Sequence, residues 1–125
     1  MHENFRNFLS YLQKYQDNEE KLKELQILDA KNVILKDEFT YPPSTVAGID
    51  VAYNNDIAYT ACITVNFEDL KILEEKVIET ELKFPYKPGF FIFREGPPIL
   101  EIVLKLNMMP DVFLINSHGI CHPLG

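Results

Sequence analysis

The chain has 125 residues, of which 46% are hydrophobic and 25% are charged. These values are typical of a globular protein, and the length allows one domain with a hydrophobic core of its own. The formal net charge of −7 argues against a protein that holds nucleic acid by bulk electrostatic attraction, because lysine and arginine are what bind phosphates. It leaves open a site in which clustered carboxylates hold Mg²⁺ and the metal meets a phosphate.

No apolar run approaches the length of a membrane span, and residues 1–6 lack the apolar core of a signal peptide. Cys62 and Cys121 are far apart and form no C-x-x-C pair, which favours reduced thiols. We therefore expect no membrane partner and a cytoplasmic location, or a nuclear one in a eukaryote. The sequence leaves the oligomeric state open.

The N-terminal part of the chain predicts two helices. Between residues 4 and 15, apolar side chains follow one another at spacings of three and four, as on the buried face of a helix: Phe5, Phe8, Leu9, Leu12 and Tyr15. Residues 17–20 can cap a second helix that continues towards Val33, with an apolar face of Leu22, Leu25 and either Leu28 or Asp29. We divide the chain into an N-terminal helix, 1–16, and a main domain, 17–125.

Three strands are predicted after the proline-containing connector 40–44. Residues 46–53 are almost all apolar, which predicts a central strand covered on both faces. Short turns lead to further strands at 57–67 and 70–82, so the three form an antiparallel meander. The alternation in the third strand predicts one solvent-facing side.

Asp50 interrupts the first of these strands. A carboxylate inside an apolar strand is costly unless it is paired, bound to a metal or placed at a cleft. The alternative is an aspartate near a strand end whose carboxylate accepts a hydrogen bond from a nearby backbone amide. The strand pattern alone leaves both interpretations open.

The stretch Phe-Pro-Tyr-Lys-Pro-Gly-Phe-Phe-Ile-Phe-Arg-Glu, at 84–95, is the most distinctive in the chain. Pro85 and Pro88 fix the backbone and predict a stiff, protruding loop with Tyr86 at its tip. An aromatic tip on a rigid loop suits stacking on bases or wedging between them. The plainer alternative is a tight turn whose tyrosine packs back on the surface.

Pro97 and Pro98 predict the start of a helix, and its apolar face consists of Ile99, Ile102, Val103 and Leu106. Glu95 lies at the N-terminal edge of this helix, where the helix dipole favours a carboxylate even without chemistry. Residues 112–115 are wholly apolar and predict a short, buried parallel strand. The predicted order is therefore α-β-β-β-α-β.

Three blocks, in this order along the chain, resemble the endonuclease V family, nucleases directed at deoxyinosine. They are Val-Ala-Gly-Ile-Asp-Val-Ala-Tyr at 46–53, the Pro-Tyr-x-Pro-Gly…Phe-Arg-Glu pattern at 85–95, and the segment 110–123. The resemblance runs from about residue 18 to the end, and the family's chain continues beyond the point that corresponds to Gly125. It implies an α/β fold with a ribonuclease H-like mixed sheet of three antiparallel strands, a helix and a parallel fourth strand. The C-terminal part of that fold is missing here, so the fourth strand would lie at an open edge.

The resemblance also implies an activity, the metal-dependent hydrolysis of the second phosphodiester bond 3′ to inosine in DNA or RNA. Asp50 and Glu95 match two of the family's ligands for Mg²⁺ or Mn²⁺, and His122 matches a histidine that assists the chemistry. The strand-separating wedge corresponds to Pro85, Tyr86, Lys87 and Pro88, and the base pocket to Gly89, Phe91 and Ser117. Arg94 is expected to be structural, paired with a neighbouring acid, with a phosphate contact as the alternative.

The sequence departs from the family at the third metal position. Asn116 stands where the family typically has aspartate, and because its amide oxygen carries no charge we expect weaker metal binding. Ser117 replaces a small residue and could crowd the base. Asp111 lies too far along the strand to substitute. His118, Cys121 and His122 offer zinc as an alternative, but no fourth ligand is near them.

Three interpretations follow from the resemblance and from this departure. The chain is an active nuclease, or a catalytically impaired relative that binds inosine-containing or distorted strands, or a truncated product with no activity.

Overall fold

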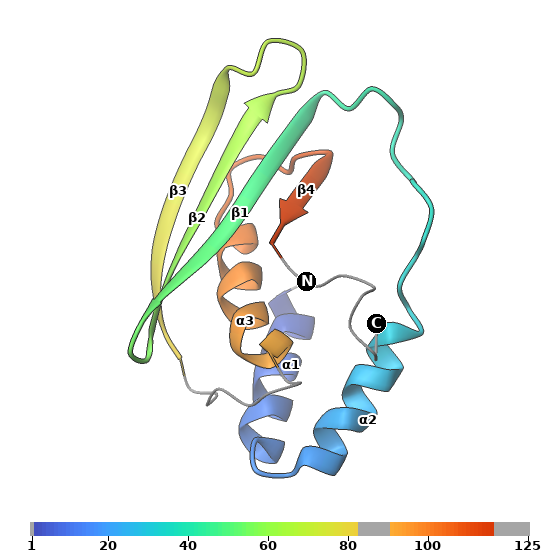
Figure 1. Ribbon diagram of the computed structural model, residues 1–125, viewed down its shortest axis with the longest axis vertical. Coiled ribbons are helices and arrows are strands. Elements are labelled where there is room, and N and C mark those ends of the chain that lie inside the picture. The colour runs from blue at the N-terminus through green and yellow to red at the C-terminus, as the bar shows by residue number, and fades with distance from the viewer. Residues whose placement is uncertain (1, 83–90, 117–125) are drawn as a thin grey trace. The chain divides into compact units, whose positions relative to one another are not determined.

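The structure, a computed structural model, describes residues 2–82 and 91–116 (Figure 1). The chain divides into two compact units, one of which holds helices α1 and α2 and reaches to Glu38. The other runs from Phe39 to Asn116 and holds a four-stranded sheet with helix α3. The boundary expected at residue 16 falls inside the first unit. In the described ranges no helix combines the length and apolar character that crossing a bilayer requires.

The first unit is a pair of helices, α1 (His2–Tyr15) and α2 (Glu19–Ala30). Asn18 caps α2, because its side-chain oxygen accepts a hydrogen bond from the Lys21 amide at 3.2 Å. This confirms the cap predicted within residues 17–20. The Tyr11 hydroxyl donates a hydrogen bond to the Lys21 carbonyl at 3.0 Å and so ties α1 to the start of α2.

The buried face of α2 differs in part from the prediction. Leu22 is fully buried, but Leu28 is 58% exposed, so its assignment to the apolar face was wrong. Six residues after Leu22, its side chain lies roughly a third of a turn away from that face. The helix also ends at Ala30, short of Val33: the Lys31 amide still bonds four residues back, but the amides of Asn32 and Val33 bond three residues back.

The second unit contains four strands and one helix, which follow in the predicted order. They are β1 (Thr45–Asn54), β2 (Ile57–Asn66), β3 (Ile72–Glu81), α3 (Phe91–Leu104) and β4 (Val112–Ile115). The sheet order is β3-β2-β1-β4, with β1, β2 and β3 antiparallel and β4 parallel to β1. This confirms the meander and the parallel fourth strand, whose bounds match the prediction.

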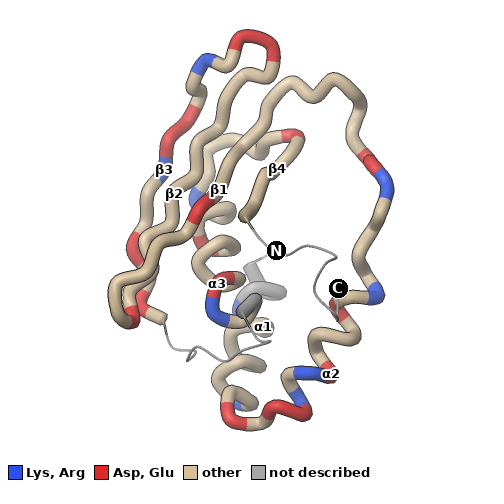
Figure 2. Tube along the Cα trace, viewed as in Figure 1, with Lys and Arg blue, Asp and Glu red and all other residues tan. Residues whose placement is uncertain are grey.

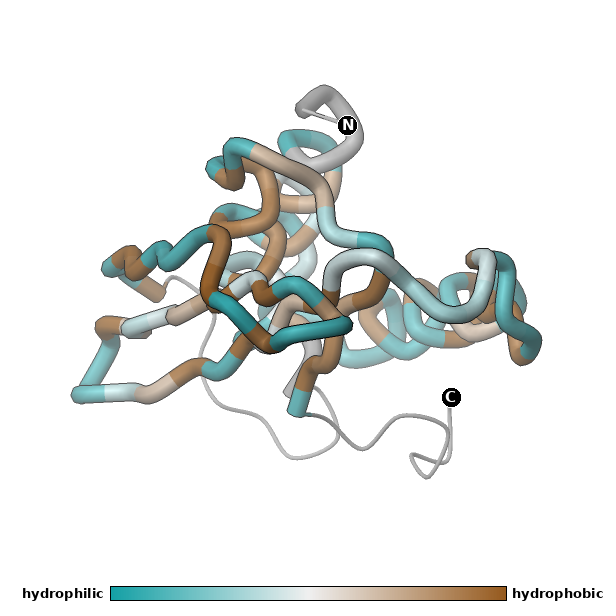
Figure 3. The backbone as a smooth tube through the Cα atoms, turned by 90° about the horizontal axis from the view of Figure 1, so that it is seen from above, coloured by the Kyte–Doolittle hydropathy of each residue, from teal (hydrophilic) through white to brown (hydrophobic). Residues whose placement is uncertain are grey.

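Helix α3 covers one face of the sheet and forms the core with it (Figure 1). The core residues alternate along the strands and recur along the helix, and partly buried apolar side chains surround them. The central residues are Ala47, Ile49, Cys62 and Ile102, with Ile78, Ile99, Val103, Leu106 and Phe113 around them. Figure 3 shows the apolar segments of this unit in brown.

The opposite face of the sheet is exposed, which makes the expectation of a β1 covered on both faces wrong for the described residues. Gly48 and Asp50 alternate with the buried Ala47 and Ile49, and both are exposed. On β4, Leu114 is 63% exposed. The apolar residues of β1 therefore lie on two different faces. One face packs against α3, and no described element of this unit covers the other. β4 lies at the edge of the sheet, as expected.

Helix α3 begins at Phe91, so Pro97 and Pro98 lie inside it and not at its start, contrary to the prediction. Prolines remove two backbone donors from the helix interior, a cost that local sequence signals do not favour. Packing overrides that cost here, because Phe93 and Pro98, on either side of the first proline, are fully buried.

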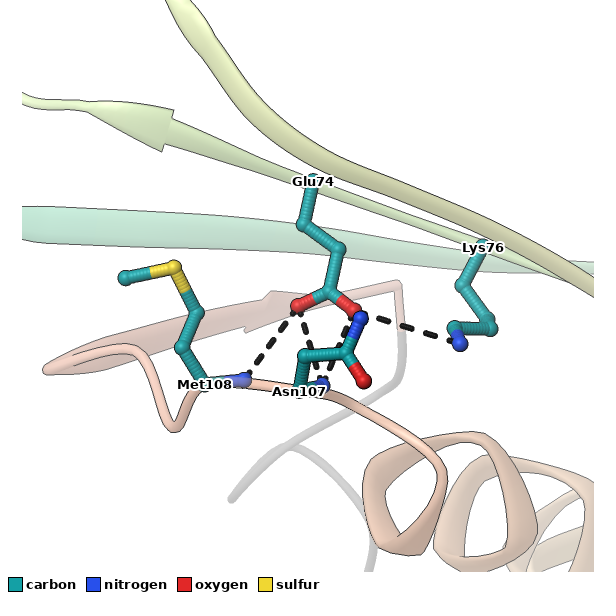
Figure 4. Close-up of polar contacts among 4 residues, drawn as sticks. All are labelled: Glu74, Lys76, Asn107 and Met108. Atoms are coloured by element: carbon teal, nitrogen blue, oxygen red, sulfur yellow. Dashed lines mark hydrogen bonds and ion pairs between the residues drawn. The ribbon is translucent and has the colours of Figure 1, made fainter.

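Strand β3 carries charged residues along its length (Figure 2), and they occupy both its half-buried and its exposed positions. Glu74, on the half-buried side, accepts hydrogen bonds from the amide of Asn107 at 2.9 and 3.2 Å and from that of Met108 at 3.4 Å (Figure 4). Lys76 adds an ion pair at 4.0 Å. One carboxylate thus fixes the connection that leads from α3 to β4.

Candidate active site

Glu95 is the centre of the candidate site. It is the fifth residue of α3 and only 8% exposed, although it carries an ionisable carboxyl group. Its Oε2 accepts a hydrogen bond from the Tyr53 hydroxyl at 3.1 Å. Burial is the main cause of a raised Glu95 pKa; the Tyr53 hydrogen bond opposes this effect, and the Asp50 carboxylate adds to it.

Asp50 lies on β1 and is exposed. Its Oδ1 accepts a hydrogen bond from the Val51 amide at 3.0 Å, which is the backbone contact named as the alternative to a metal site. Its effect on the Glu95 pKa shows that the two carboxylates also lie close enough to interact. Because that hydrogen bond leaves the second oxygen available, the backbone contact and a ligand role are compatible.

Asn116 directly follows β4. The last register pair between β1 and β4 joins Ile49 to Ile115, so the next step of the same register brings Asn116 level with Asp50. Neighbouring strands lie about 4.8 Å apart, and both residues fall on the face away from α3. The structure therefore places Asp50 and the Asn116 position level on neighbouring strands, while Glu95 comes from the helix on the other face and is linked to Asp50 by the effect of that carboxylate on its pKa.

The donor set consists of two carboxylates and one amide oxygen. In the described part of the chain no group of three or more His, Cys, Asp or Glu residues is arranged to hold a metal ion. Asn116 offers an amide oxygen at the position where the resemblance implies a third carboxylate. Asp111 cannot replace it, because its carboxylate accepts the amides of Ser44 and Thr45 at the other end of β4. Oxygen donors of this kind still fit the hard cations Mg²⁺ and Mn²⁺.

Tyr53 and Arg94 complete the surroundings of Glu95. The Arg94 guanidinium lies 5.3 Å from the centre of the Tyr53 ring and donates a hydrogen bond to the Asn55 carbonyl at 3.2 Å. Burial, and after it the charge of Glu95, raise the Tyr53 pKa, so the phenol keeps its proton at neutral pH. Arg94 thus contacts a backbone carbonyl and an aromatic ring, and its expected pairing with a neighbouring acid stays a prediction.

Sequence reasoning did not select Tyr53, although it ends the block 46–53. The signal that was available is a phenol at the end of an apolar strand, a position where a buried hydroxyl needs a partner. Its partner comes from a helix 42 residues further along the chain, which no local pattern indicates.

Several predicted site residues lie outside the described ranges. These are the wedge residues Pro85, Tyr86, Lys87 and Pro88, the pocket residues Gly89 and Ser117, and His118, Cys121 and His122. Phe91 is the first residue of α3, and its side chain also lies outside what is described. Their roles stay predictions.

A mixed sheet with three antiparallel strands, a crossing helix and a parallel fourth strand is the ribonuclease H-like arrangement. Comparisons with known proteins agree. The family model described as Endonuclease V matches residues 28–125. The chain belongs to the endonuclease V family.

Relatives from archaea and bacteria show the extent of the similarity. The chain is 39% identical to the endonuclease V of Pyrococcus abyssi over 104 residues, 83% of this chain and 52% of that protein. It is 39% identical to that of a Nostoc species over 93 residues, 73% of this chain and 42% of that protein. The chain therefore spans about half the length, or less, of such relatives.

Solved structures of the family share the fold. The endonuclease V of Streptomyces avermitilis superposes with a TM-score of 0.77 at 31% identity, over 86% of this chain and 48% of that one. The Ciona intestinalis enzyme, in complex with a 24mer DNA containing an inosine followed by a ribo-adenosine, superposes with a TM-score of 0.72 at 25% identity, over 81% of this chain and 46% of that one.

Proposed function

We propose that this chain acts as an endonuclease V-type nuclease that hydrolyses the second phosphodiester bond 3′ to inosine in DNA or RNA, a repair activity. The observation that supports the proposal is the register of β1 and β4, which brings Asn116 level with Asp50, together with a buried Glu95 whose pKa Asp50 helps to raise. The inosine-containing DNA in the Ciona complex supports the choice of substrate.

We further propose Mg²⁺ or Mn²⁺ as the cofactor, held by Asp50, Glu95 and Asn116. The two carboxylates repel each other, and burial disfavours the charge on Glu95, so a divalent cation would stabilise the charged form of both. When bound, the metal supplies a water of lowered pKa and positive charge beside the phosphate. A cytoplasmic location, or a nuclear one in a eukaryote, remains part of the proposal.

The chain's own residues then divide the work. Asp50 and Glu95 bind through charged oxygens, and Asn116 contributes a neutral one. By the resemblance, His122 assists proton transfer, and the wedge at 85–88 separates the strands so that the base reaches a pocket lined by Gly89, Phe91 and Ser117.

Asn116 favours a second candidate, a relative that binds inosine-containing strands without cutting them. Removing one anionic ligand weakens metal binding more than it affects strand recognition, because the wedge at 85–88 lies elsewhere in the chain.

A cleavage assay separates the two candidates. The purified chain is incubated with single-stranded inosine DNA and RNA and Mg²⁺ or Mn²⁺, with Glu95→Ala as control and Asn116→Asp as a gain-of-function variant. Cleavage at the second phosphodiester bond 3′ to inosine supports the nuclease if it is absent in Glu95→Ala. If the parent chain is folded and binds inosine-containing strands without cutting them, and only Asn116→Asp cuts, the binding relative is supported. A folded protein that neither cuts nor binds as either form would contradict both.

A further inference from the structure

Tyr53 connects two elements that carry the candidate ligands. It lies on β1, three residues after Asp50, and its hydroxyl donates to Oε2 of Glu95 on α3 at 3.1 Å. Within the described residues this hydrogen bond is a direct side-chain link between the strand of one carboxylate and the helix of the other.

The ring of the same tyrosine is held from the other side. The Arg94 guanidinium lies 5.3 Å from the ring centre, and its Nη2 is anchored on the Asn55 carbonyl at the β1–β2 turn. A guanidinium that faces an aromatic ring is attracted to it electrostatically and so favours this position of the ring. Two consecutive residues of α3 thus contact the Tyr53 side chain, Arg94 at the ring and Glu95 at the hydroxyl. These two contacts restrict the rotation of the phenol.

The consequence falls on Glu95. A glutamate side chain has three rotatable bonds, and fixing it at the moment of binding costs conformational entropy. Here Oε2 is already held, while Oε1 has no hydrogen-bond partner among the described residues. A carboxylate with one oxygen fixed by a hydrogen bond and the other available is preorganised to bind a cation.

We infer that Tyr53 is a positioning residue, whose hydroxyl holds the Glu95 carboxylate in the orientation in which its other oxygen binds a divalent cation. This inference rests on the proposed function. Tyr53 itself touches neither metal nor substrate and acts through Glu95.

The test is a set of variants that separate the hydroxyl from the ring. Tyr53→Phe removes the hydroxyl and keeps the ring under Arg94, and Tyr53→Leu removes both. Tyr59→Phe is the matched control, since Tyr59 lies half-buried on the neighbouring strand β2. Mn²⁺ affinity is measured by calorimetry, and stability by urea unfolding of the metal-free protein.

We expect Tyr53→Phe to weaken Mn²⁺ binding about tenfold, as is usual for outer-sphere partners of metal ligands, and Tyr59→Phe to leave it unchanged. In the Glu95→Ala background, Tyr53→Phe should have no further effect, because no side-chain oxygen is left at position 95 to accept the hydrogen bond. Equal Mn²⁺ affinity of Tyr53→Phe and the parent chain would overturn the inference. A loss of affinity of the same size when Tyr53→Phe is added to Glu95→Ala would overturn it as well.

A metal-free measurement distinguishes this inference from the proposed function. Carbon-13 NMR of the Glu95 carboxyl group, assigned by its disappearance in Glu95→Gln, reports its pKa directly. Tyr53→Phe should raise that pKa, because the hydroxyl lowers it. An unchanged Glu95 pKa refutes the contact whatever the metal does. If Tyr53→Phe raises the Glu95 pKa but the parent chain binds no Mn²⁺, the Tyr53–Glu95 contact is real, and the proposed metal site and the positioning role that rests on it are both refuted.

Discussion

Replacing Glu74 with alanine should destabilise the protein more than the same change at any exposed position of β3. The Glu74 side chain is only 8% exposed, and its carboxylate accepts the amides of Asn107 and Met108. Hydrogen bonds to a charged group contribute about 1.5–3 kcal/mol each.

The magnitude follows from the three contacts. The Asn107 bond is short, at 2.9 Å, while the Met108 bond is long, at 3.4 Å, and both residues are exposed enough for water to replace part of what is lost. The ion pair with Lys76, at 4.0 Å and 30% exposure of the lysine, adds little. We therefore expect a loss of about 2 kcal/mol, below the roughly 3–6 kcal/mol of two such bonds at full strength, which for a chain of this size lowers Tm by roughly 8 °C.

The assay is urea and thermal unfolding followed by circular dichroism. Glu75→Ala is the matched control, since Glu75 is the next residue of the same strand, is exposed, and changes charge and strand propensity by the same amount. We expect Glu75→Ala to change the free energy of unfolding by less than about 0.5 kcal/mol. If the two variants lose equal stability, the carboxylate does not hold the α3–β4 connection and the reasoning is refuted.

Three further predictions concern the second unit. Thr60 is fully buried and its hydroxyl has no hydrogen-bond partner among the described residues, so Thr60→Val should raise the free energy of unfolding by about 1 kcal/mol; a loss in urea unfolding would show that the hydroxyl is satisfied. Leu70 has a φ of 61°, so Leu70→Gly should stabilise the β2–β3 turn by about 1 kcal/mol, and a destabilised variant in the same assay would argue against that backbone conformation. Burial raises the pKa of the Cys62 thiol, so less of it is thiolate at pH 8 than in a free cysteine; in a Cys121→Ser variant, Ellman's reagent should react only in urea, and rapid native-state labelling would contradict this.

Much of the fold follows from patterns that the sequence displays locally. The bounds of β4 were predicted to the residue, because four apolar residues stand between a loop with proline and a polar segment. The start of α3 was misplaced because Pro97 and Pro98 are strong local signals for a first turn, while the reason they lie inside the helix is the packing of Phe93 and Pro98.

The candidate site divides in the same way. Asp50, Glu95 and Asn116 were selected from blocks of residues. Strand register brings Asn116 level with Asp50, and the Asp50 carboxylate contributes to the raised pKa of Glu95. Tyr53 escaped notice because its role depends on one hydrogen bond between a strand and a helix, and periodicity within either element carries no information about the other.

Asp111 is excluded from the site, but its contacts decide which residue enters it. Its Oδ2 accepts the amides of Ser44 and Thr45 at 2.8 and 3.3 Å, and its own amide donates to the Thr45 hydroxyl at 3.0 Å. These hydrogen bonds join β1 and β4 where both strands begin, and so they fix the register of the parallel pair. A slip of one residue would bring a different side chain level with Asp50 and would reverse which residues of β4 face α3. The chemistry possible at one end of β4 is therefore set by a carboxylate at its other end.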